Sequence, residues 1–477
     1  MIRQKKNIAV LGLLLGAALT AGAFSLLVPF KAYQVPLIGY NLPGDIGGPG
    51  APSEGYRWNV PEITYAIDQS FFLYFGTNGV RAIEQAFEIL NNLPPMSRIT
   101  NDAVNLYSTN GAPFPTDAKG PPNLLYETLG LNDVKSTALT FLMEELGLTE
   151  PERYTWALRG RAILGMPPTT NYAVIKQNFD PITRSPSSYV NDHLYTYTIE
   201  DPFAINPLVT DAVELPVDPT DPFVFSSVAG KNLFAGQFYI NLTRDDVGGL
   251  RFLYGTNNIV TENLLGTVTG GLPLSGSSSP WAPYLGLGTT NFVGTNILFV
   301  TNVVGTNLIV QGLRPGIDKL RFRRVNFDSI IGQQFATVTN LYMDVVITNA
   351  RPILQPVQRA IAAPDIIFAA EDLGLAANLI PFTIARTGTA GWQNNDAING
   401  RAAQGGPGVI PPSVTIRFTD QFPFFLNFTP SFLTEGTGIS SGVWASFDGT
   451  TNAPVIYPAY GGITLQDLQN QILGTGP

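Results

Sequence analysis

The side chains best placed to do chemistry lie along one predicted helix. Residues 132–148 are expected to be helical, because apolar side chains recur at spacings of three and four and Gly147 is placed to end the helix. The opposite face carries Thr140, Glu144 and Glu145. Neighbouring carboxylates of this kind could bind calcium. The simpler expectation is that both glutamates are solvated in the last turn of the helix.

Few other residues in the chain are candidates for a catalytic or metal-binding role. The 477 residues contain no cysteine, which excludes disulfides, thiolate metal sites and cysteine nucleophiles. His193 is the one histidine, and no nucleophile elbow or partner motif accompanies it, so we assign it no role. Gly230-Lys231 lacks the upstream glycine of a phosphate-binding loop. No motif supports a glycosidase with two carboxylates.

The N-terminus has the pattern of a secretory signal peptide. Three basic residues precede an apolar run from Ile8 to about Leu19, and residues 21–23 read Ala-Gly-Ala. We expect cleavage after Ala23 and a protein that is exported to the periplasm, the cell surface or the extracellular space. If the segment stays uncleaved, the apolar character that continues to Phe30 makes it long enough to anchor the chain in a membrane.

The charge of the chain restricts its partners. The mature protein keeps all 36 Asp and Glu and loses three of the 27 Lys and Arg, so its net charge is −12. This argues against nucleic acid or anionic lipid as the main partner. Charged residues are only 13% of the chain, against a usual value of about 25%. Such a surface suits a matrix or coat, with a protein, a polysaccharide or further copies of the chain as partner.

A strand followed by a helix is predicted near the start of the mature chain. Ile63, Tyr65 and Ile67 alternate with more polar residues, which indicates a strand with one buried face. After an aromatic loop at 70–75, Asn78 is expected to cap a helix, because apolar residues follow it at helical spacing.

A second helix is predicted over 242–255. Thr243 and Asp246 have the spacing of a capping box in which aspartate takes the usual place of glutamate. Val247 is placed to form a hydrophobic staple with the residue before the cap, and Gly255 should end the helix.

The residues of these elements resemble a known family. Residues 242–255 read Leu-Thr-x-Asp-Asp-Val-x-Gly-Leu-x-x-Leu-Tyr-Gly, which is similar to the last helix of the catalytic domain of matrixins, the matrix metalloproteinases, within the metzincins. Arg57-Trp58, 63–65 and 80–87 resemble the first strand and first helix of that domain, in the same order. The resemblance covers about residues 56–257.

This resemblance implies a degenerate zinc site on the helix at 132–148. The family binds zinc with His-Glu-x-x-His-x-x-Gly-x-x-His. Aligned on the glycine of the turn, Thr140, Glu144 and Glu150 stand at the histidine positions and Phe141 at the general base. The resemblance therefore implies a pseudo-peptidase in which Phe141 packs into the core. We assign no catalytic, metal-binding or cofactor-binding residue and expect no cofactor.

An active enzyme remains as the alternative. A zinc metalloendopeptidase with non-standard ligands would need Glu144, Glu150 and the distant His193. The methionine turn of the family has two weak candidates, Met166-Pro167 and residues 234–237.

The rest of the chain is predicted to be rich in strands. From residue 256 onward, short runs of Val, Ile, Phe and Thr are separated by Gly, Asn and Pro, which predicts sandwich-like all-β structure, with a boundary at a proline cluster spanning 352–364. We expect a multidomain α+β protein. Its predicted parts are a signal peptide at 1–23, a Pro/Gly-rich leader at 24–55, a matrixin-like α/β-sheet domain at 56–257 with a long insertion at about 151–227, a β domain at 258–355, and a β domain at 356–477 with a short C-terminal helix.

Two segments of this part could bind polymers. Lys319, Arg321 and Arg323 alternate with apolar residues, so one strand face would be basic. It could hold an anionic polymer, although protection of an edge strand explains it more simply. The aromatic run 418–432 could stack on sugars, and core packing is the simpler explanation.

Overall fold

The structure is a computed structural model of the whole chain. It describes residues 22–29, 48–101, 118–201, 210–218, 227–230, 233–270, 308–371, 385–389, 393–394, 407–419, 443–458 and 464–473. Within these residues the protein is a mixed α+β structure with mostly strands and five α-helices. The predicted β-rich α+β class is therefore confirmed.

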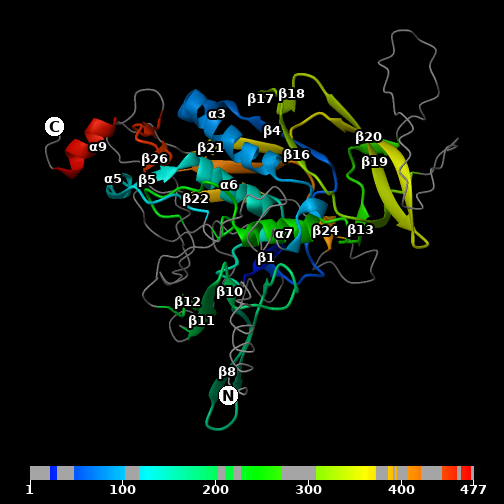
Figure 1. The fold of residues 1–477 in the computed structure, drawn as a ribbon, viewed down its shortest axis with the longest axis horizontal. Coiled ribbons are helices and arrows are strands. Elements are labelled where there is room, and N and C mark those ends of the chain that lie inside the picture. The colour runs from blue at the N-terminus through cyan, green and yellow to red at the C-terminus, as the bar shows by residue number, and fades with distance from the viewer. Residues whose placement is uncertain are drawn as a thin grey trace, which may run out of the picture.

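A mixed sheet of five strands forms the centre of the fold (Figure 1). In sheet order the strands are β16 (Arg321–Arg324), β4 (Glu62–Ile67), β21 (Ile366–Glu371), β25 (Val414–Thr419) and β22 (Ala385–Thr389). The first four are parallel, and β22 runs antiparallel at one edge. The predicted strand at 63–67 is thus β4, whose neighbours both come from far along the chain.

Helix α3 (Gln69–Asn92) follows β4 and packs against the sheet. The side chain of Asp68 caps it, so it begins well before the predicted start at Asn78. Residues 70–75, predicted as a loop, are helical because their aromatic side chains have a core to fill. A non-helical Gly76 (φ 59°) interrupts the helix, and the predicted start lies just beyond this break.

Helix α6 (Val134–Glu145) is the helix predicted at 132–148 and lies beside α3. Its N-cap is Asp133, whose carboxylate accepts the backbone N–H of Ser136 at 2.9 Å, and not the preceding Asn132. Gly147 has φ +95°, so the chain leaves the helix in the left-handed conformation that the glycine predicted.

Helix α7 (Arg244–Tyr254) matches its prediction closely. Thr243 is the N-cap, and its side chain and that of Asp246 bond reciprocally to each other's backbone N–H, which completes the capping box. Gly255 is the C-cap. Local sequence signals were sufficient here because both ends of the helix are determined by side chains within it.

The segment predicted as a leader without a core contains two buried strands. β1 (Phe24–Val28) pairs with β2 (Gly48–Gly50), β6 (Leu148–Thr149) and β9 (Asn178–Phe179). All five residues of β1 are buried. The prediction for 24–55 is wrong for these residues, because the apolar run that follows the signal-like segment is part of the main core.

The predicted cleavage position lies inside the folded protein. Ala23 is fully buried and Phe24 is 2% exposed. A peptidase cannot reach a bond between two buried residues, so cleavage after Ala23 would have to come before β1 takes its place. Among the described residues, no helix has the length and apolar character needed to cross a membrane.

The predicted insertion at 151–227 is built from strands. They are β7 (Ala157–Leu164), β8 (Thr169–Ile175), β9, β10 (Tyr189–Val190), β11 (His193–Glu200) and β12 (Asp211–Pro216). β7 and β8 form a hairpin that projects away from the body (Figure 1). This segment shows no clear periodicity in sequence because its strands are half exposed or lie at edges.

A second sheet of five strands is antiparallel. In sheet order it consists of β13 (Val260–Asn263), β15 (Gln311–Arg314), β19 (Val338–Thr348), β20 (Arg351–Ile361) and β14 (Val268–Gly270). Pro352 and Pro356 lie inside β20, so the predicted boundary at residue 355 runs through a strand. The prolines are tolerated because β14 pairs with β20 only from Val357 to Arg359.

The predicted boundary at residue 257 does not separate two folded units either. The guanidinium of the buried Arg57 donates to Glu262 Oε1 (2.6 Å) and to the backbone oxygen of Arg314 (3.1 Å). Arg314 in turn donates to Asp344 Oδ1 (3.0 Å). These buried ion pairs connect Arg57, near the start of the predicted domain at 56–257, to the second sheet. In addition, β4 pairs with strands from both predicted β domains.

The remaining elements complete the described fold. They are β3 (Tyr56–Arg57), η1 (Met96–Arg98), α5 (Leu124–Thr128), β5 (Leu131–Asp133), β17 (Phe327–Asp328), β18 (Gln333–Gln334), β23 (Gln393–Asn394), β24 (Gly408–Val409), β26 (Val443–Ser446), β27 (Val455–Ile456) and the short C-terminal helix α9 (Leu465–Ile472). β26 pairs in parallel with β5 directly before α6.

Candidate functional site

The four positions that would carry the chemistry of a matrixin are all in the interior. Thr140, Phe141, Glu144 and Glu150 are each 1% exposed. The reason is that α6 is surrounded: it contacts α3, β5, β6, β25 and β26. Lys135 in the first turn is the one residue of α6 that is not buried, so Thr140, Phe141 and Glu144 offer no surface to a substrate.

Phe141 has become part of the core, as predicted. It belongs to the main buried apolar cluster, which also contains Trp58 just after β3, Leu142 of α6 itself and Leu250 of α7. The hydroxyl of Thr140 beside it donates to the backbone oxygen of Ser136 one turn earlier (3.2 Å). Both side chains therefore serve the packing of α6.

The expectation that Glu144 and Glu145 are solvated is wrong. They are 1% and 0% exposed, because the end of α6 lies under other elements and not at the surface. The carboxyl oxygens of Glu145 have no hydrogen-bond partner among the described residues. Burial, and secondarily the nearby Glu144, raises the pKa of Glu145 well above its usual value. Burial at this position therefore favours the neutral form of the Glu145 carboxyl over the charged one.

The groups of the alternative enzyme do not form a metal site. Within the part of the chain that the structure describes, no three His, Asp or Glu side chains come together as ligands would. His193 follows a tight turn formed by Asn191 and Asp192, both with positive φ, in the hairpin of β10 and β11. Glu144 and Glu150 are in the buried part of the fold.

The two candidates for the methionine turn are exposed. Met166 is 99% exposed at the tip of the β7–β8 hairpin, and Phe234 is 51% exposed in a turn. Neither can lie beneath a site on the buried α6.

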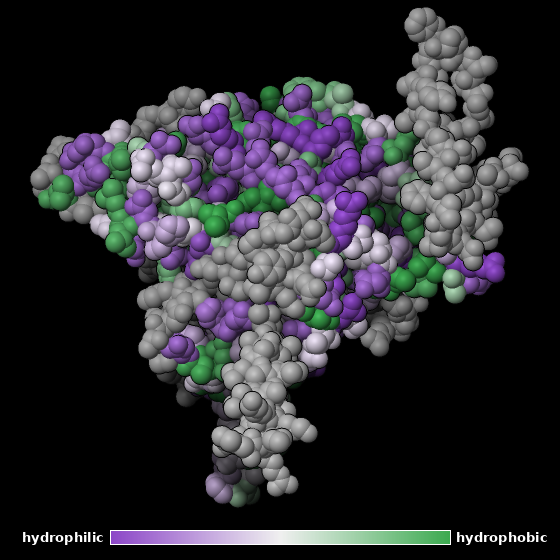
Figure 2. All heavy atoms as spheres, viewed as in Figure 1, coloured by the Kyte–Doolittle hydropathy of each residue, from purple (hydrophilic) through white to green (hydrophobic). Residues whose placement is uncertain are grey.

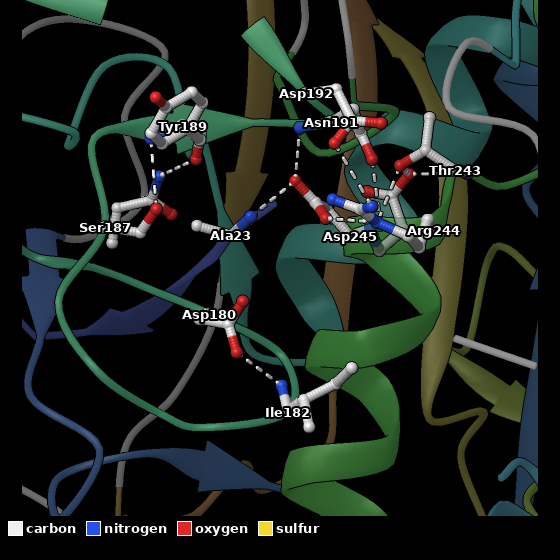
Figure 3. A network of polar contacts seen from close by, with 12 residues as sticks. Ala23, Asp180, Ile182, Ser187, Tyr189, Asn191, Asp192, Thr243, Arg244 and Asp245 are labelled. Carbon is white, nitrogen blue, oxygen red and sulfur yellow. Dashed lines mark hydrogen bonds and ion pairs between the residues drawn. The ribbon is translucent and has the colours of Figure 1, made fainter. Parts of the chain in front are cut away.

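The start of α7 carries a buried polar network that the sequence did not reveal (Figure 3). Asp245 Oδ2 accepts the backbone N–H groups of Ala23 and Asn191, both at 2.6 Å. Arg244 is buried beside it and lies 3.4 Å from a carboxylate oxygen of Asp192. Burial raises the pKa of Asp245 to about 7, partly offset by Arg244 and the two amides.

This network shows the structural role of each residue in the Asp245-Asp246 pair, which is part of the resemblance to matrixins. Asp246 caps α7, whereas Asp245 ties the start of β1 and the turn at 191–192 to that helix. The pair of adjacent aspartates at the start of the helix was the sequence signal for this network, because capping the helix needs only one of them.

Two of the three residues of the predicted basic strand face, Lys319 and Arg323, have partners within the protein, whereas Arg321 is exposed. β16 is an edge strand, where Arg323 pairs with Glu62 (2.8 Å) and Lys319 Nζ donates to the backbone oxygen of Asn91 (2.6 Å). These contacts favour edge protection over binding of an anionic polymer. Of the aromatic run 418–432, Phe418 is buried in the core and its other aromatic residues lie outside the described residues.

A polar cleft of about 510 Å³ lies in the described part of the molecule and has room for a ligand. One wall is the outer face of α3, where hydrophilic side chains gather (Figure 2). The opposite wall is the segment from β26 to β27. The side chains that line it are mostly amides, hydroxyls and charged groups: Asn78, Arg81, Gln85, Glu88, Asn92, Asp133, Lys135, Ser446, Asp448, Thr450 and Asn452.

The cleft has unused hydrogen-bonding capacity. The amide side chains of Asn78, Gln85 and Asn92 bond to no other described residue, and they recur along one face of α3. Arg81 and Lys135 are balanced by two exposed carboxylates in the same lining. Sequence reasoning missed this cleft because its two walls are more than 350 residues apart.

Comparisons of the chain with protein-family models, with curated proteins and with solved structures find no match. The resemblance to matrixins therefore rests on the residues quoted above.

Replacing Phe141 tests whether this position is core. Phe141→Ala should lower the free energy of unfolding by about 3–5 kcal/mol, because it leaves a cavity. Phe141→Glu should be worse, since it buries a carboxyl without a partner. Denaturant unfolding measures both. Phe72→Ala, at a 42% exposed position on α3, is the control. Unchanged stability of both Phe141 variants would mean that the position faces an open cleft.

The stability of the protein should depend on the ionisation of Glu145. Its pKa is raised in the folded state, so the folded protein holds this proton more tightly than the unfolded chain. The contribution is therefore complete below about pH 4.5 and is lost as the pH rises through the folded-state pKa.

Glu145→Gln should match the unchanged protein near pH 4.5 and be more stable than it at about pH 8, because glutamine cannot ionise. Urea unfolding across this range is the measurement, and the exposed Glu88→Gln is the control. Asp245 contributes in the same direction, so only part of the pH dependence should disappear. Parallel pH profiles for Glu145→Gln and the unchanged protein would contradict the assignment.

Proposed function

We propose that the chain is an exported, non-catalytic binding protein of the cell surface or extracellular matrix, built on a matrixin-like framework that has lost its metal site. The observation that carries the proposal is the burial of Phe141 and Glu144 on α6 and of Glu150 shortly after that helix. A peptidase needs those positions to be open to water, metal and substrate.

The character of the surface supports a role in fixed assemblies. The chain has few charges and many uncharged polar residues, which weakens repulsion between surfaces. The signal-like N-terminus supports export. Both are arguments from sequence, and they agree with a protein that is retained by contacts and does not diffuse freely.

The cleft between α3 and the β26–β27 segment is the proposed binding site, and an uncharged polysaccharide is the proposed ligand. Its volume of about 510 Å³ lies within the range of about 300–1,000 Å³ that is usual for small-molecule sites. Amides such as those of Gln85 and Asn452 can each donate to and accept from sugar hydroxyls. The nearly balanced charges of the lining favour a neutral ligand over an acidic polymer.

Metal analysis tests the non-catalytic part of the proposal. Protein purified without chelator should contain well below one equivalent of zinc per chain, because the ligand positions are inside the core. It should also cleave no peptide or protein substrate. Elemental analysis and a fluorogenic peptide assay are the measurements. About one tightly bound zinc together with chelator-sensitive cleavage would establish the alternative, a zinc metalloendopeptidase.

Polysaccharide binding tests the cleft. The double variant Gln85→Ala and Asn452→Ala removes one amide from each wall and should weaken binding by about 30-fold, because two lost hydrogen bonds of about 1 kcal/mol each amount to about 2 kcal/mol. Pull-down with cellulose, chitin and β-glucan, and with alginate as an acidic comparison, provides the measurement. The exposed Gln333→Ala lies outside the cleft and is the control. Equal binding by all three proteins, or binding to alginate alone, would rule out this site.

A further inference from the structure

Three amide side chains stand at equal intervals along the wall of the cleft that α3 forms. Asn78, Gln85 and Asn92 line the cleft, all are exposed, and each follows the previous one by seven residues. Seven residues are just under two helical turns, so successive amides are about 10 Å apart and drift around the helix by only about 20°. All three lie after the break at Gly76, in the uninterrupted part of the helix. The amides therefore form a nearly straight row about 21 Å long.

The same wall is apolar between the amides. Ala82 and Ile89 also line the cleft, and they too are seven residues apart, each midway between two amides. Ala82 is buried, and Ile89 is partly buried against the main core. A hydrogen-bonding group and a small apolar surface thus alternate along the wall about every 5 Å. The whole pattern repeats once in about 10 Å.

This repeat matches one type of polysaccharide backbone. In an extended β-1,4-linked chain of glucose or N-acetylglucosamine, successive rings are turned over, so the same groups return to the same side at every second sugar. The length of this disaccharide repeat is close to the spacing of the amides. Each ring also has hydroxyl groups at its rim, which amides can bind as donors and as acceptors, and apolar C–H groups on its faces. Chains of α-1,4-linked or β-1,3-linked glucose curve into helices, so their rings do not follow a straight row at equal steps.

The other wall can contact the same chain from its second side. Thr450 and Asn452 line the cleft from the segment between β26 and β27, and both are exposed. Ile240, which is 54% exposed, adds an apolar contact to the lining. A ligand in the cleft is therefore held between two walls, which suits a linear chain that runs along α3.

We propose that the cleft selects extended β-1,4-linked chains of glucose or N-acetylglucosamine, and that Asn78, Gln85 and Asn92 bond to alternate sugars of one chain. This inference rests on the proposed function, because it concerns the same cleft and names the linkage that the cleft recognises. Contacts on alternate sugars mean that about five consecutive sugars reach all three amides, which span about 21 Å. The helix sets this interval, so the linkage determines binding more than the identity of the sugar does.

Oligosaccharides of defined length and linkage test the inference on the full-length protein. In isothermal titration calorimetry, cellohexaose and chitohexaose should bind about 30-fold more tightly than laminarihexaose and maltohexaose, because a curved chain keeps one amide contact and loses two. The affinity for cello-oligosaccharides should rise with length until the chain has about five sugars and then level off.

Alanine variants along the row distinguish a periodic site from an unordered polar surface. Gln85→Ala should weaken the binding of cellohexaose and cellotetraose alike, by about fivefold, because both positions open to a tetrasaccharide use the central amide. Asn78→Ala should weaken cellohexaose by a similar factor but change cellotetraose by no more than about twofold, since the tetrasaccharide still reaches Gln85 and Asn92. Thr77→Ala, at an exposed position of α3 outside the cleft, is the matched control and should bind as the unchanged protein does.

The results separate this inference from the proposed function. Equal affinity for hexasaccharides of all three linkages, reduced by the double change Gln85→Ala and Asn452→Ala, would overturn the choice of linkage and leave the binding site in place. Equal effects of Asn78→Ala and Gln85→Ala on cellotetraose would overturn the periodic row in the same way. Binding of no saccharide, or binding that the double change leaves intact, would overturn both the inference and the proposed site.

Discussion

The rest of the structure depends on one constraint, which is that α6 is almost entirely buried. Strands, a helix and the buried β1 sheet meet around it, and Lys135 is the one residue of the helix that is partly exposed. Burial raises the pKa of Glu145 well above its usual value, and the backbone oxygen of this residue accepts a hydrogen bond from Nε1 of Trp58 (2.7 Å). A site of reaction at this place would require the removal of β26 and β5, which hold the first turn of the helix. Helix α6, whose sequence resembles a catalytic helix, therefore lies in the core and stabilises the fold.

Local features were predictable from sequence, and long-range ones were not. The capping box of α7, the left-handed Gly147 and the strand containing Ile63 were predicted because short segments determine them. The predicted start of α3 was too late, because Gly76 interrupts the helix. Helix propensity alone could not show that the aromatic residues before Gly76 pack in the core. The domain boundaries failed because Arg57 and β4 find their partners more than 200 residues away.

The candidate site shows the same division. Phe141 could be assigned to the core from its type and position, and the structure agrees. The glutamates after it could not be placed, because a polar face on a helix predicts exposure only when nothing else packs there. The cleft along α3 and the network of Asp245 unite residues from distant segments, and no local pattern marks them in advance.

The order of strands in the central sheet also governs when the protein can fold. β4 is made early, but the strands on either side of it come from residues near 320 and 366. A nascent chain that leaves the ribosome would carry β4 with both edges unpaired until most of the sequence has followed. Such contacts between distant segments form slowly and leave strand edges open to association with other chains. The central sheet of this chain can therefore close only after most of the chain has been synthesised.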